Sequence, residues 1–382
     1  MNDIEQKKSI HLCLVSEQAN PNLVPLLDES MEVDFVVLLY TDQTYTQAQN
    51  LASVLKSYQL KSELKALPDA FDIVQLREYF SDLYDSYLAN PGVKLSCNVT
   101  GGTKPMSLAM FETAYLTEVD GSEAYYVDLN NQLSWLIPQD KQTVQLQNRI
   151  KLKDFLQIRG FSLSKQPKQD GRLRSTKALS ESIATQIKRY RPALTQLNYL
   201  AATAKADRDL RSKEVEHLSY ELEDLISELE RYQLVKFQKG RLVFANETAR
   251  FYCNGGWLEE YLYHCVRELS ASKNIRDFQH SVELENNGVK NEIDLMALIN
   301  NRVVMFECKT FKTDVSEEVN KSLYKLQTLT ESIGGRTASA VFVSLNDLKP
   351  ANRERAKEMN IKIIAGEQLG SLKSILSDVL SK

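Results

Sequence analysis

The chain of 382 residues lacks the features that mark membrane and secreted proteins. No run reaches the roughly 18 apolar residues that a membrane-spanning helix needs. The polar opening Met1–Lys8 does not have the apolar core of a signal peptide. These absences predict a globular protein of the cytoplasm with no membrane partner.

Cysteine is scarce, with five residues in the whole chain. They lie far apart, at Cys13, Cys97, Cys253, Cys265 and Cys308, and no Cys-x-x-Cys pair occurs. This spacing argues against both a disulfide framework and a zinc knuckle. We therefore expect buried thiols.

Several catalytic and nucleotide-binding motifs are also missing. The sequence contains neither Gly-x-x-x-x-Gly-Lys-Ser/Thr nor Gly-x-Gly-x-x-Gly. The four histidines are isolated from one another, and no Ser-His-Asp or nucleophilic cysteine arrangement stands out. A P-loop, a dinucleotide-binding turn and covalent hydrolysis are thus not indicated.

Charge, by contrast, is plentiful and unevenly distributed. Residues 1–150 carry 10 Lys or Arg and 20 Asp or Glu, whereas residues 151–200 carry 11 and 3. The basic stretch either lies along a nucleic-acid backbone or serves as a solubilising connector, and the sequence leaves both open. Length and a hydrophobic content of 43% suggest two or three domains.

The first 140 residues alternate between strand-like and helix-like runs, which predicts an α/β domain with a mostly parallel sheet. The runs are Ile10–Val15, Leu23–Leu27, Val33–Tyr40, Gln47–Tyr58, Leu76–Leu88, Lys94–Val99, Pro105–Thr117 and Glu123–Asp128. In such sheets ligands bind beyond the carboxyl ends of the strands. Two of these strand exits carry suitable residues, Ser16 to Asn22 and Thr100 to Lys104.

The exit at Thr100-Gly101-Gly102-Thr103-Lys104 is the more informative. The glycines let backbone amides approach an anion, the threonines supply hydroxyls, and the lysine supplies charge. Pro105 then starts a helix whose positive end faces the site. Since residues 1–150 are acidic overall, we expect a compact ligand here rather than a long polyanion.

Residues 151–250 predict a connector followed by a small helical module. The polar stretch Ser162–Ser175 is the expected inter-domain loop. The expected elements of the module are helices at Ala193–Ala204, Lys213–Leu218 and Glu221–Tyr232 and a hairpin at Leu234–Phe244 that turns at Lys239-Gly240. Three helices and a β-wing are typical of a winged-helix module.

A winged helix raises an alternative function, a ligand-sensing transcription regulator without catalysis. The helix that would enter DNA, Glu221–Glu230, carries five acidic residues and would be repelled by phosphate. We therefore interpret the module as a spacer or dimerisation element. A second alternative, a metal-independent ribonuclease built on Arg211 and His217, rests on a spacing that occurs readily by chance.

The most distinctive stretch lies in residues 251–382. Two β-rich runs, Glu292–Ile299 and Arg302–Lys309, flank Asn300-Asn301, which predicts a hairpin. Alternation places Glu307 and Lys309 on one face, and the hairpin can bring Asp294 beside them. Asp294 sits in an apolar run, where an unpaired carboxylate is costly without a ligand.

Two carboxylates and an ammonium are what metal-dependent phosphodiester hydrolysis requires. Asp294 and Glu307 would hold Mg²⁺ or Mn²⁺, and Lys309 would orient the attacking water or stabilise the charged phosphate. Asp294, twelve residues, then Glu307-Cys308-Lys309 resembles the signature of the PD-(D/E)xK restriction-endonuclease-like superfamily.

The resemblance implies a sheet flanked by helices and an additional glutamate from a preceding helix. Gly255–Val266 is similar to that helix. We select Glu259 over Glu260 because 259 borders the apolar stripe of the helix. Lys321–Gln327 predicts the next helix, where such proteins sometimes place an accessory Lys or Gln.

Asn98–Lys104 and Ser16–Asn22 together resemble the CRISPR-associated Rossmann fold (CARF) domain. With the carboxyl-terminal motif, the chain is similar to the CARF nucleases of type III CRISPR systems. That resemblance implies a homodimer that binds cyclic tetra-adenylate across its two-fold axis and then cleaves single-stranded DNA or RNA with little sequence specificity. The implied ligand contacts are Ser16, Gln18, Asn22, Thr41, Asp42, Thr100, Gly101, Gly102, Thr103 and Lys104.

The sequence therefore predicts three parts. Residues 1–150 form a Rossmann-like CARF sensor domain and residues 151–250 form the basic linker and winged-helix-like module. Residues 251–382 form a restriction-endonuclease-like α/β/α nuclease domain.

Overall fold

The computed structural model describes residues 9–117, 122–147, 149–163, 176–204, 209–310 and 316–381. The chain divides into two compact units. The first comprises Met1–Ser164 and Leu284–Lys290, and the second comprises Lys165–Glu283 and Asn291–Lys382. The first unit thus extends beyond the expected boundary at residue 150, and the expected second and third parts form one unit.

A seven-stranded sheet forms the centre of the described part of the first unit, in the order β3-β2-β1-β4-β5-β6-β7. The first five strands in this order are parallel, and β6 and β7 are antiparallel. The strands are β1 (Ser9–Leu14), β2 (Phe35–Tyr40), β3 (Lys61–Ala66), β4 (Lys94–Asn98), β5 (Ser122–Val127), β6 (Gln132–Ile137) and β7 (Val144–Gln145). The mostly parallel α/β sheet is therefore confirmed.

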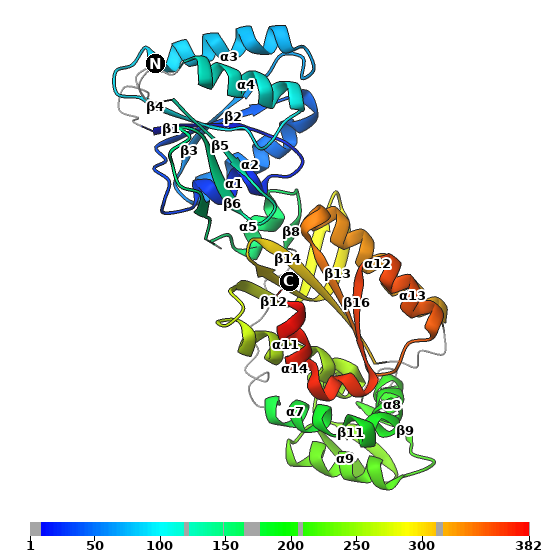
Figure 1. Cartoon of the computed structure of the whole chain (residues 1–382). Helices are drawn as coiled ribbons and strands as arrows, with labels where there is room; N and C mark the ends of the chain where they lie inside the picture. Colours follow the sequence, from blue (N-terminus) through cyan, green and yellow to red (C-terminus); the bar gives the residue numbers. More distant parts are fainter. Residues whose placement is uncertain are drawn as a thin grey trace. The chain divides into compact units, whose positions relative to one another are not determined.

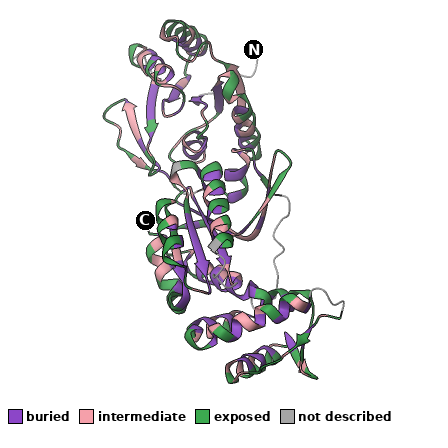
Figure 2. Ribbon diagram, turned by 90° about the vertical axis from the view of Figure 1, so that its right-hand side faces the viewer, coloured by how far each residue is buried: buried purple, intermediate pink, exposed green. Residues whose placement is uncertain are grey.

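Helices cover both faces of this sheet, with α3 and α4 on one side and α1 and α2 on the other (Figure 1). The helices are α1 (Asn20–Leu26), α2 (Tyr45–Ser57), α3 (Ile73–Leu88), α4 (Lys104–Leu116) and α5 (Leu152–Gln157). Because both faces are covered, the central strands β1, β2 and β4 are mostly apolar and almost entirely buried (Figure 2). The expected loop Ser162–Ser175 begins in strand β8 (Ser162–Leu163), and its remainder lies outside the described residues.

The second unit begins with the expected winged-helix-like module. Its elements are α7 (Lys177–Thr185), α8 (Ile187–Ala204), β9 (Arg211–Glu214), α9 (Tyr220–Arg231), β10 (Val235–Gln238), β11 (Arg241–Phe244) and α10 (Glu247–Phe251). The predicted turn at Lys239-Gly240 is confirmed, with φ of 48° and 71°, as a two-residue hairpin of this kind needs.

The prediction of a helix over Lys213–Leu218 is wrong. Strand β9 pairs there with β11, and the hydroxyl of Ser212 accepts a hydrogen bond from the Leu242 amide at 3.0 Å. Tertiary pairing overrides a weak local helix propensity. Arg211 therefore lies in a strand, and the Arg211–His217 spacing is not presented on one helix.

The rest of the second unit is a sheet between helices. Its elements are α11 (Trp257–Leu269), β12 (Ile275–Asn286), β13 (Val289–Ile299), β14 (Arg302–Lys309), α12 (Ser316–Gly334), β15 (Ser339–Ser344), α13 (Pro350–Glu358), β16 (Ile361–Ala365) and α14 (Leu372–Val379). The strand order is β16-β15-β14-β13-β12. At the tip of the β12–β13 hairpin, in the first unit, Leu284 pairs with Leu163 of β8.

Helices α12 and α13 lie on one face of this second sheet, and α11 and α14 lie on the other (Figure 1). This is the expected α/β/α arrangement. The five cysteines are free and buried, as predicted. Among the described helices, none combines the length and apolarity needed to cross a membrane.

Candidate functional site

The first unit has a cavity of about 680 Å³ at the carboxyl ends of its parallel strands. Its lining contains five of the predicted ligand residues, Ser16, Thr41, Asp42, Gly102 and Thr103. Three separate strand exits, after β1, β2 and β4, thus contribute to one cavity. Parallel strands present their carboxyl ends at the same edge, which brings these loops together.

The loop after β4 is held tightly against β1. A Cβ atom at Gly101 would lie 2.2 Å from the carbonyl oxygen of Leu14, so only glycine permits this approach. Thr103 caps α4, since its hydroxyl accepts from the Met106 amide at 3.4 Å and donates to the Ala70 carbonyl at 2.5 Å. Gly101 and Thr103 therefore fix the start of α4 beside the cavity.

Other predicted ligand residues have structural partners. Asn22 is 1% exposed; its amide donates to the Leu14 carbonyl at 2.8 Å and accepts from Asn98 at 2.9 Å. The Thr100 hydroxyl accepts from the Val127 amide at 2.8 Å. We infer that Asn22 and Thr100 shape the loops rather than reach a ligand.

Gln18 and Lys104 are exposed and lie outside the cavity lining. The structure adds a wall that sequence reasoning missed, the segment Leu67–Phe71 after β3. That strand, Lys-Ser-Glu-Leu-Lys-Ala, is polar and half-exposed at the sheet edge, so it gives no strand signal. Pro68-Asp69 follow the carboxyl end of β3, where ligands bind in such sheets. They could not be recognised as candidates from the sequence because β3 itself was not predicted.

In the second unit the β13–β14 hairpin aligns the predicted catalytic side chains. Leu295 is opposite Phe306, which puts Asp294 next to Glu307 across the ladder. The Cys308 amide donates to Asp294 Oδ2 at 2.6 Å. Lys309 forms an ion pair with Glu307. The expected turn at Asn300-Asn301 is confirmed, with positive φ at both residues.

Glu259 joins this cluster from α11. A π-helical turn, Tyr252–Gly256, precedes the helix, and Gly255 has a φ of 104°. A Cβ atom at Gly255 would lie 2.1 Å from the hydroxyl of Thr310, the residue after β14. The turn thus packs the start of α11 against the end of the strand that carries Lys309.

The neighbouring Glu260 points elsewhere, because it is buried and accepts a hydrogen bond from Thr176 at 2.6 Å. The structure therefore brings Glu259, rather than Glu260, into electrostatic contact with Asp294, Glu307 and Lys309.

The electrostatics of the cluster are those of crowded carboxylates. Burial and then the charge of Asp294 raise the pKa of Glu259 to about 9. Burial and then the charge of Glu307 raise the pKa of Asp294 to about 6. Burial lowers the pKa of Lys309, but Glu307 and Asp294 outweigh it, and the net direction is upward. A bound cation would relieve this repulsion.

Lys325 of α12 is a site residue that sequence reasoning located only loosely, within Lys321–Gln327. Its ammonium lies 4.0 Å from Glu307 Oε2 and donates to the carbonyl of Glu292 at 2.7 Å. Gln327 of the same helix instead bonds to Glu331 at 3.1 Å. Lys325 thus links α12 to the carboxylate cluster.

The donor set suits a hard divalent cation. Within the described ranges, no group of three or more His, Cys, Asp or Glu side chains is arranged to hold a metal ion by itself. Mg²⁺ commonly binds through one or two carboxylates and keeps several waters. Asp294 and Glu307, with water completing the shell, fit that pattern.

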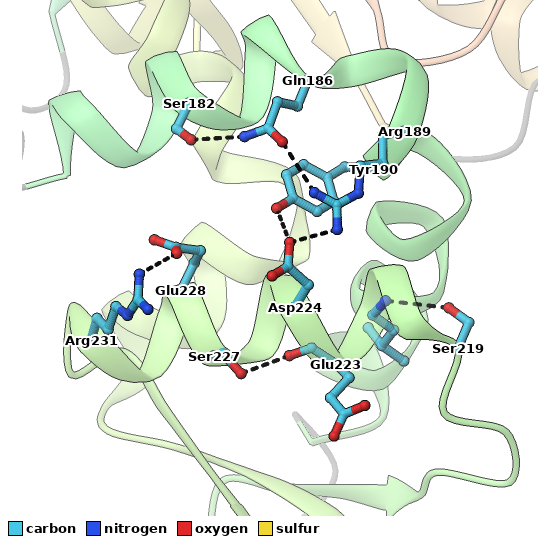
Figure 3. A network of polar contacts seen from close by, with 11 residues as sticks. Ser182, Gln186, Arg189, Tyr190, Ser219, Glu223, Asp224, Ser227, Glu228 and Arg231 are labelled. Atoms are coloured by element: carbon cyan, nitrogen blue, oxygen red, sulfur yellow. Dashed lines mark hydrogen bonds and ion pairs between the residues drawn. The ribbon is translucent and has the colours of Figure 1, made fainter.

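The middle module does not resemble a DNA-reading surface. Helix α9 buries its leucines and exposes acidic side chains, including Glu223 and Glu230. Figure 3 shows Asp224 of α9 bound to Arg189, at 3.0 Å, and to Tyr190 of α8. Arg189 of α8 is thus paired with an acidic residue of α9, which supports a structural role for the module.

Both ends of the chain match known families. Residues 10–155 match the family model described as Card1 CARF domain, and residues 245–382 match the model described as Card1-like, endonuclease domain. The chain therefore combines a CARF domain with a Card1-like endonuclease domain. The prediction of this class is confirmed.

Solved structures agree with this assignment. The chain is similar to protein VC1899 from Vibrio cholerae, with 25% identity over 98% of each chain and a TM-score of 0.89. It is also similar to Can2 from Sulfobacillus thermosulfidooxidans in complex with cyclic tetra-adenylate, with 24% identity over 98% of this chain and 100% of that chain and a TM-score of 0.80.

A more distant likeness is to a type III CRISPR defence DNA nuclease activated by cyclic oligoadenylate, with 20% identity and a TM-score of 0.58. It covers 89% of this chain and 45% of that chain. A comparison with curated proteins gives no match.

Proposed function

We propose that this protein is a nuclease of type III CRISPR defence that cyclic tetra-adenylate activates and that cleaves single-stranded DNA or RNA. The observation that carries the proposal is the convergence of Glu259, Asp294, Glu307 and Lys309 in the part of the chain that matches an endonuclease. The similar fold of Can2, whose structure holds cyclic tetra-adenylate, supports the identity of the activator.

The catalytic cluster has the composition of a PD-(D/E)xK site. In this proposal Asp294 and Glu307 hold Mg²⁺ or Mn²⁺, and Glu259 assists. A divalent cation held by these carboxylates would supply the charge that lowers the pKa of water and neutralises phosphate. Lys309, held by Glu307, orients the attacking water, and its charge stabilises the phosphate as negative charge develops.

The sensor cavity would take the activator. Ser16, Thr41, Asp42, Gly102 and Thr103 line it. Gln18 and Lys104 lie exposed on the same loops, where the amide and ammonium can reach adenylate phosphates. Asn22, Thr100 and Gly101 hold these loops in place.

A homodimer fits the surface of the first unit. Helix α4 exposes Leu108, Tyr115 and Leu116, by 59%, 52% and 74% of their areas. Exposed apolar side chains gathered on one helix are typical of an interface. A two-fold axis would place two sensor cavities near one ring-shaped, symmetric activator.

The decisive experiment measures cleavage of labelled single-stranded DNA and RNA with Mn²⁺, with and without cyclic tetra-adenylate. We expect cleavage only with both additions and its loss with EDTA. Asp294→Asn keeps an acceptor for the Cys308 amide but loses the charge. Because loss of an outer-shell partner already costs about 10- to 100-fold, we expect a rate at least about 100-fold lower.

The winged-helix regulator makes the opposite prediction. Such a protein would bind cyclic tetra-adenylate and duplex DNA equally well as Asp294→Asn and would cleave nothing. Wild-type protein that stays inactive with Mn²⁺ and activator would overturn the nuclease proposal.

A further inference from the structure

A tyrosine of α12 that directly precedes Lys325 in the sequence is open to solvent. Tyr324 of α12 is 52% exposed, whereas its helix neighbours Leu323 and Leu326 are buried against the sheet. The next residue, Lys325, is the one whose ammonium lies 4.0 Å from Glu307. An open aromatic ring is thus attached to the helix at the edge of the proposed active site.

The ring is positioned by a cation on the neighbouring helix. The guanidinium of Arg355, on α13, lies 5.8 Å from the centre of the Tyr324 ring. The two helices are also joined by a hydrogen bond of 2.9 Å between Asn352 and Asn320. An arginine over a tyrosine leaves a flat, polarised ring that can take a second planar group.

The surroundings favour a nucleic acid strand over an apolar partner. Lys321 and Lys325 lie three residues before and one residue after Tyr324, and both are exposed. On a helix, Lys321 is the neighbour of both Tyr324, three residues on, and Lys325, four residues on. Lys321 is paired with Glu317 at 2.9 Å, a contact that phosphate can replace because both side chains are more than 70% exposed.

We propose that Tyr324, backed by Arg355, stacks on an unpaired base next to the scissile phosphate, with Lys325 facing the backbone. This rests on the proposed nuclease function and deepens it, because it makes an unpaired base part of what the site recognises. Every base has a stacking face, so the contact tolerates any sequence. A paired base in a duplex presents no free face and is excluded.

The test compares Tyr324→Ala with Tyr324→Phe, and with Tyr199→Ala as a control at another exposed tyrosine of the same unit. Each variant is assayed with Mn²⁺ and cyclic tetra-adenylate on three substrates. These are a single-stranded oligonucleotide, a strand of equal length built from abasic tetrahydrofuran units, and bis(p-nitrophenyl) phosphate.

Stacking on one base contributes about 1–3 kcal/mol, so we expect Tyr324→Ala to raise KM for the oligonucleotide roughly 5- to 140-fold. Tyr324→Phe and Tyr199→Ala should match wild type. On the abasic strand, Tyr324→Ala should equal wild type, since this strand offers no base to stack on the ring. A merely structural role would lower all three activities together.

The stacking role of Tyr324 would be overturned by an unchanged KM of Tyr324→Ala for the oligonucleotide. An equal rise in KM for the abasic strand would overturn it too. Binding separates this failure from failure of the nuclease proposal. Fluorescence anisotropy with the labelled strand, in the Asp294→Asn background with and without Tyr324→Ala, measures stacking without cleavage. A lower affinity for the labelled strand after removal of the ring supports stacking on Tyr324 even if no cleavage occurs.

Discussion

Asp294 shows how a single residue links the sequence to the proposed chemistry. It sits between Ile293 and Leu295, which are both buried, so its carboxylate would be costly without partners. The structure supplies the Cys308 amide at 2.6 Å and the charge of Lys309. The sequence predicted that Asp294 needs partners. The hydrogen bond from the Cys308 amide, however, follows only from the register of the two strands.

His11 gives a prediction at the same scale. It is buried in β1, with Nε2 2.8 Å from the Glu32 carbonyl, and burial lowers its pKa to about 4 from 6.5. Between these pH values the unfolded chain binds a proton that the folded chain excludes. The free energy of unfolding of the first unit should therefore fall as pH drops from about 6.5 to 4, by up to about 3 kcal/mol.

The measurement is urea unfolding of the full chain at pH 7 and at pH 4.5. The chain has two tryptophans, so fluorescence of Trp135 in a Trp257→Phe background reports on the first unit. His11→Gln should reduce the difference between the two pH values. An identical difference with and without His11 would rule out this residue as the source.

At the scale of elements, the local sequence was enough to predict an element where a tight turn sets the pairing of two strands. The β13–β14 hairpin was predictable because Asn300-Asn301 accepts the positive φ values of a tight turn. Strands β3 and β9 were missed because both are polar and are held by their neighbours in a sheet. Pairing with a distant strand leaves no pattern in the paired segment itself.

The π-helical turn before α11 yields the element-scale prediction. Gly255→Ala would bring Cβ within 2.1 Å of the Thr310 hydroxyl and strain a backbone at φ 104°. We expect a loss of about 2 kcal/mol in stability and slower cleavage, because Glu259 and Lys309 lie on either side of this contact.

Gly288→Ala is the matched control. Its φ is 78°, and nothing lies within 4 Å of the added Cβ, so it measures backbone strain alone. Urea midpoints and cleavage rates of the two variants are compared. Equal effects in both assays would contradict a special role for the packing of Gly255 on Thr310.

At the scale of the whole molecule, the chain joins a CARF domain to an endonuclease domain, and the proposed dimer would couple the two. If the exposed face of α4 is the dimer interface, Leu116→Glu buries an unpaired charge there. We expect sedimentation velocity to show a monomer and cleavage to lose its response to cyclic tetra-adenylate.

Leu129→Glu provides the comparison, since Leu129 is also exposed in the first unit, by 58%, but lies after β5 rather than on α4. It should remain dimeric and responsive. A wild-type protein that sediments as a monomer at micromolar concentration, or a dimeric Leu116→Glu variant, would remove α4 from consideration as the interface.

The sequence alone determined the fold class, the Thr100–Lys104 loop and the pairing of Asp294 with Glu307, because periodicity, turns and short motifs are local properties. The tertiary structure decided that Lys325 joins the carboxylate cluster and that Leu67–Phe71 completes the cavity of the first unit. Those outcomes depend on how separate elements pack, and packing is set by contacts between residues far apart in the chain.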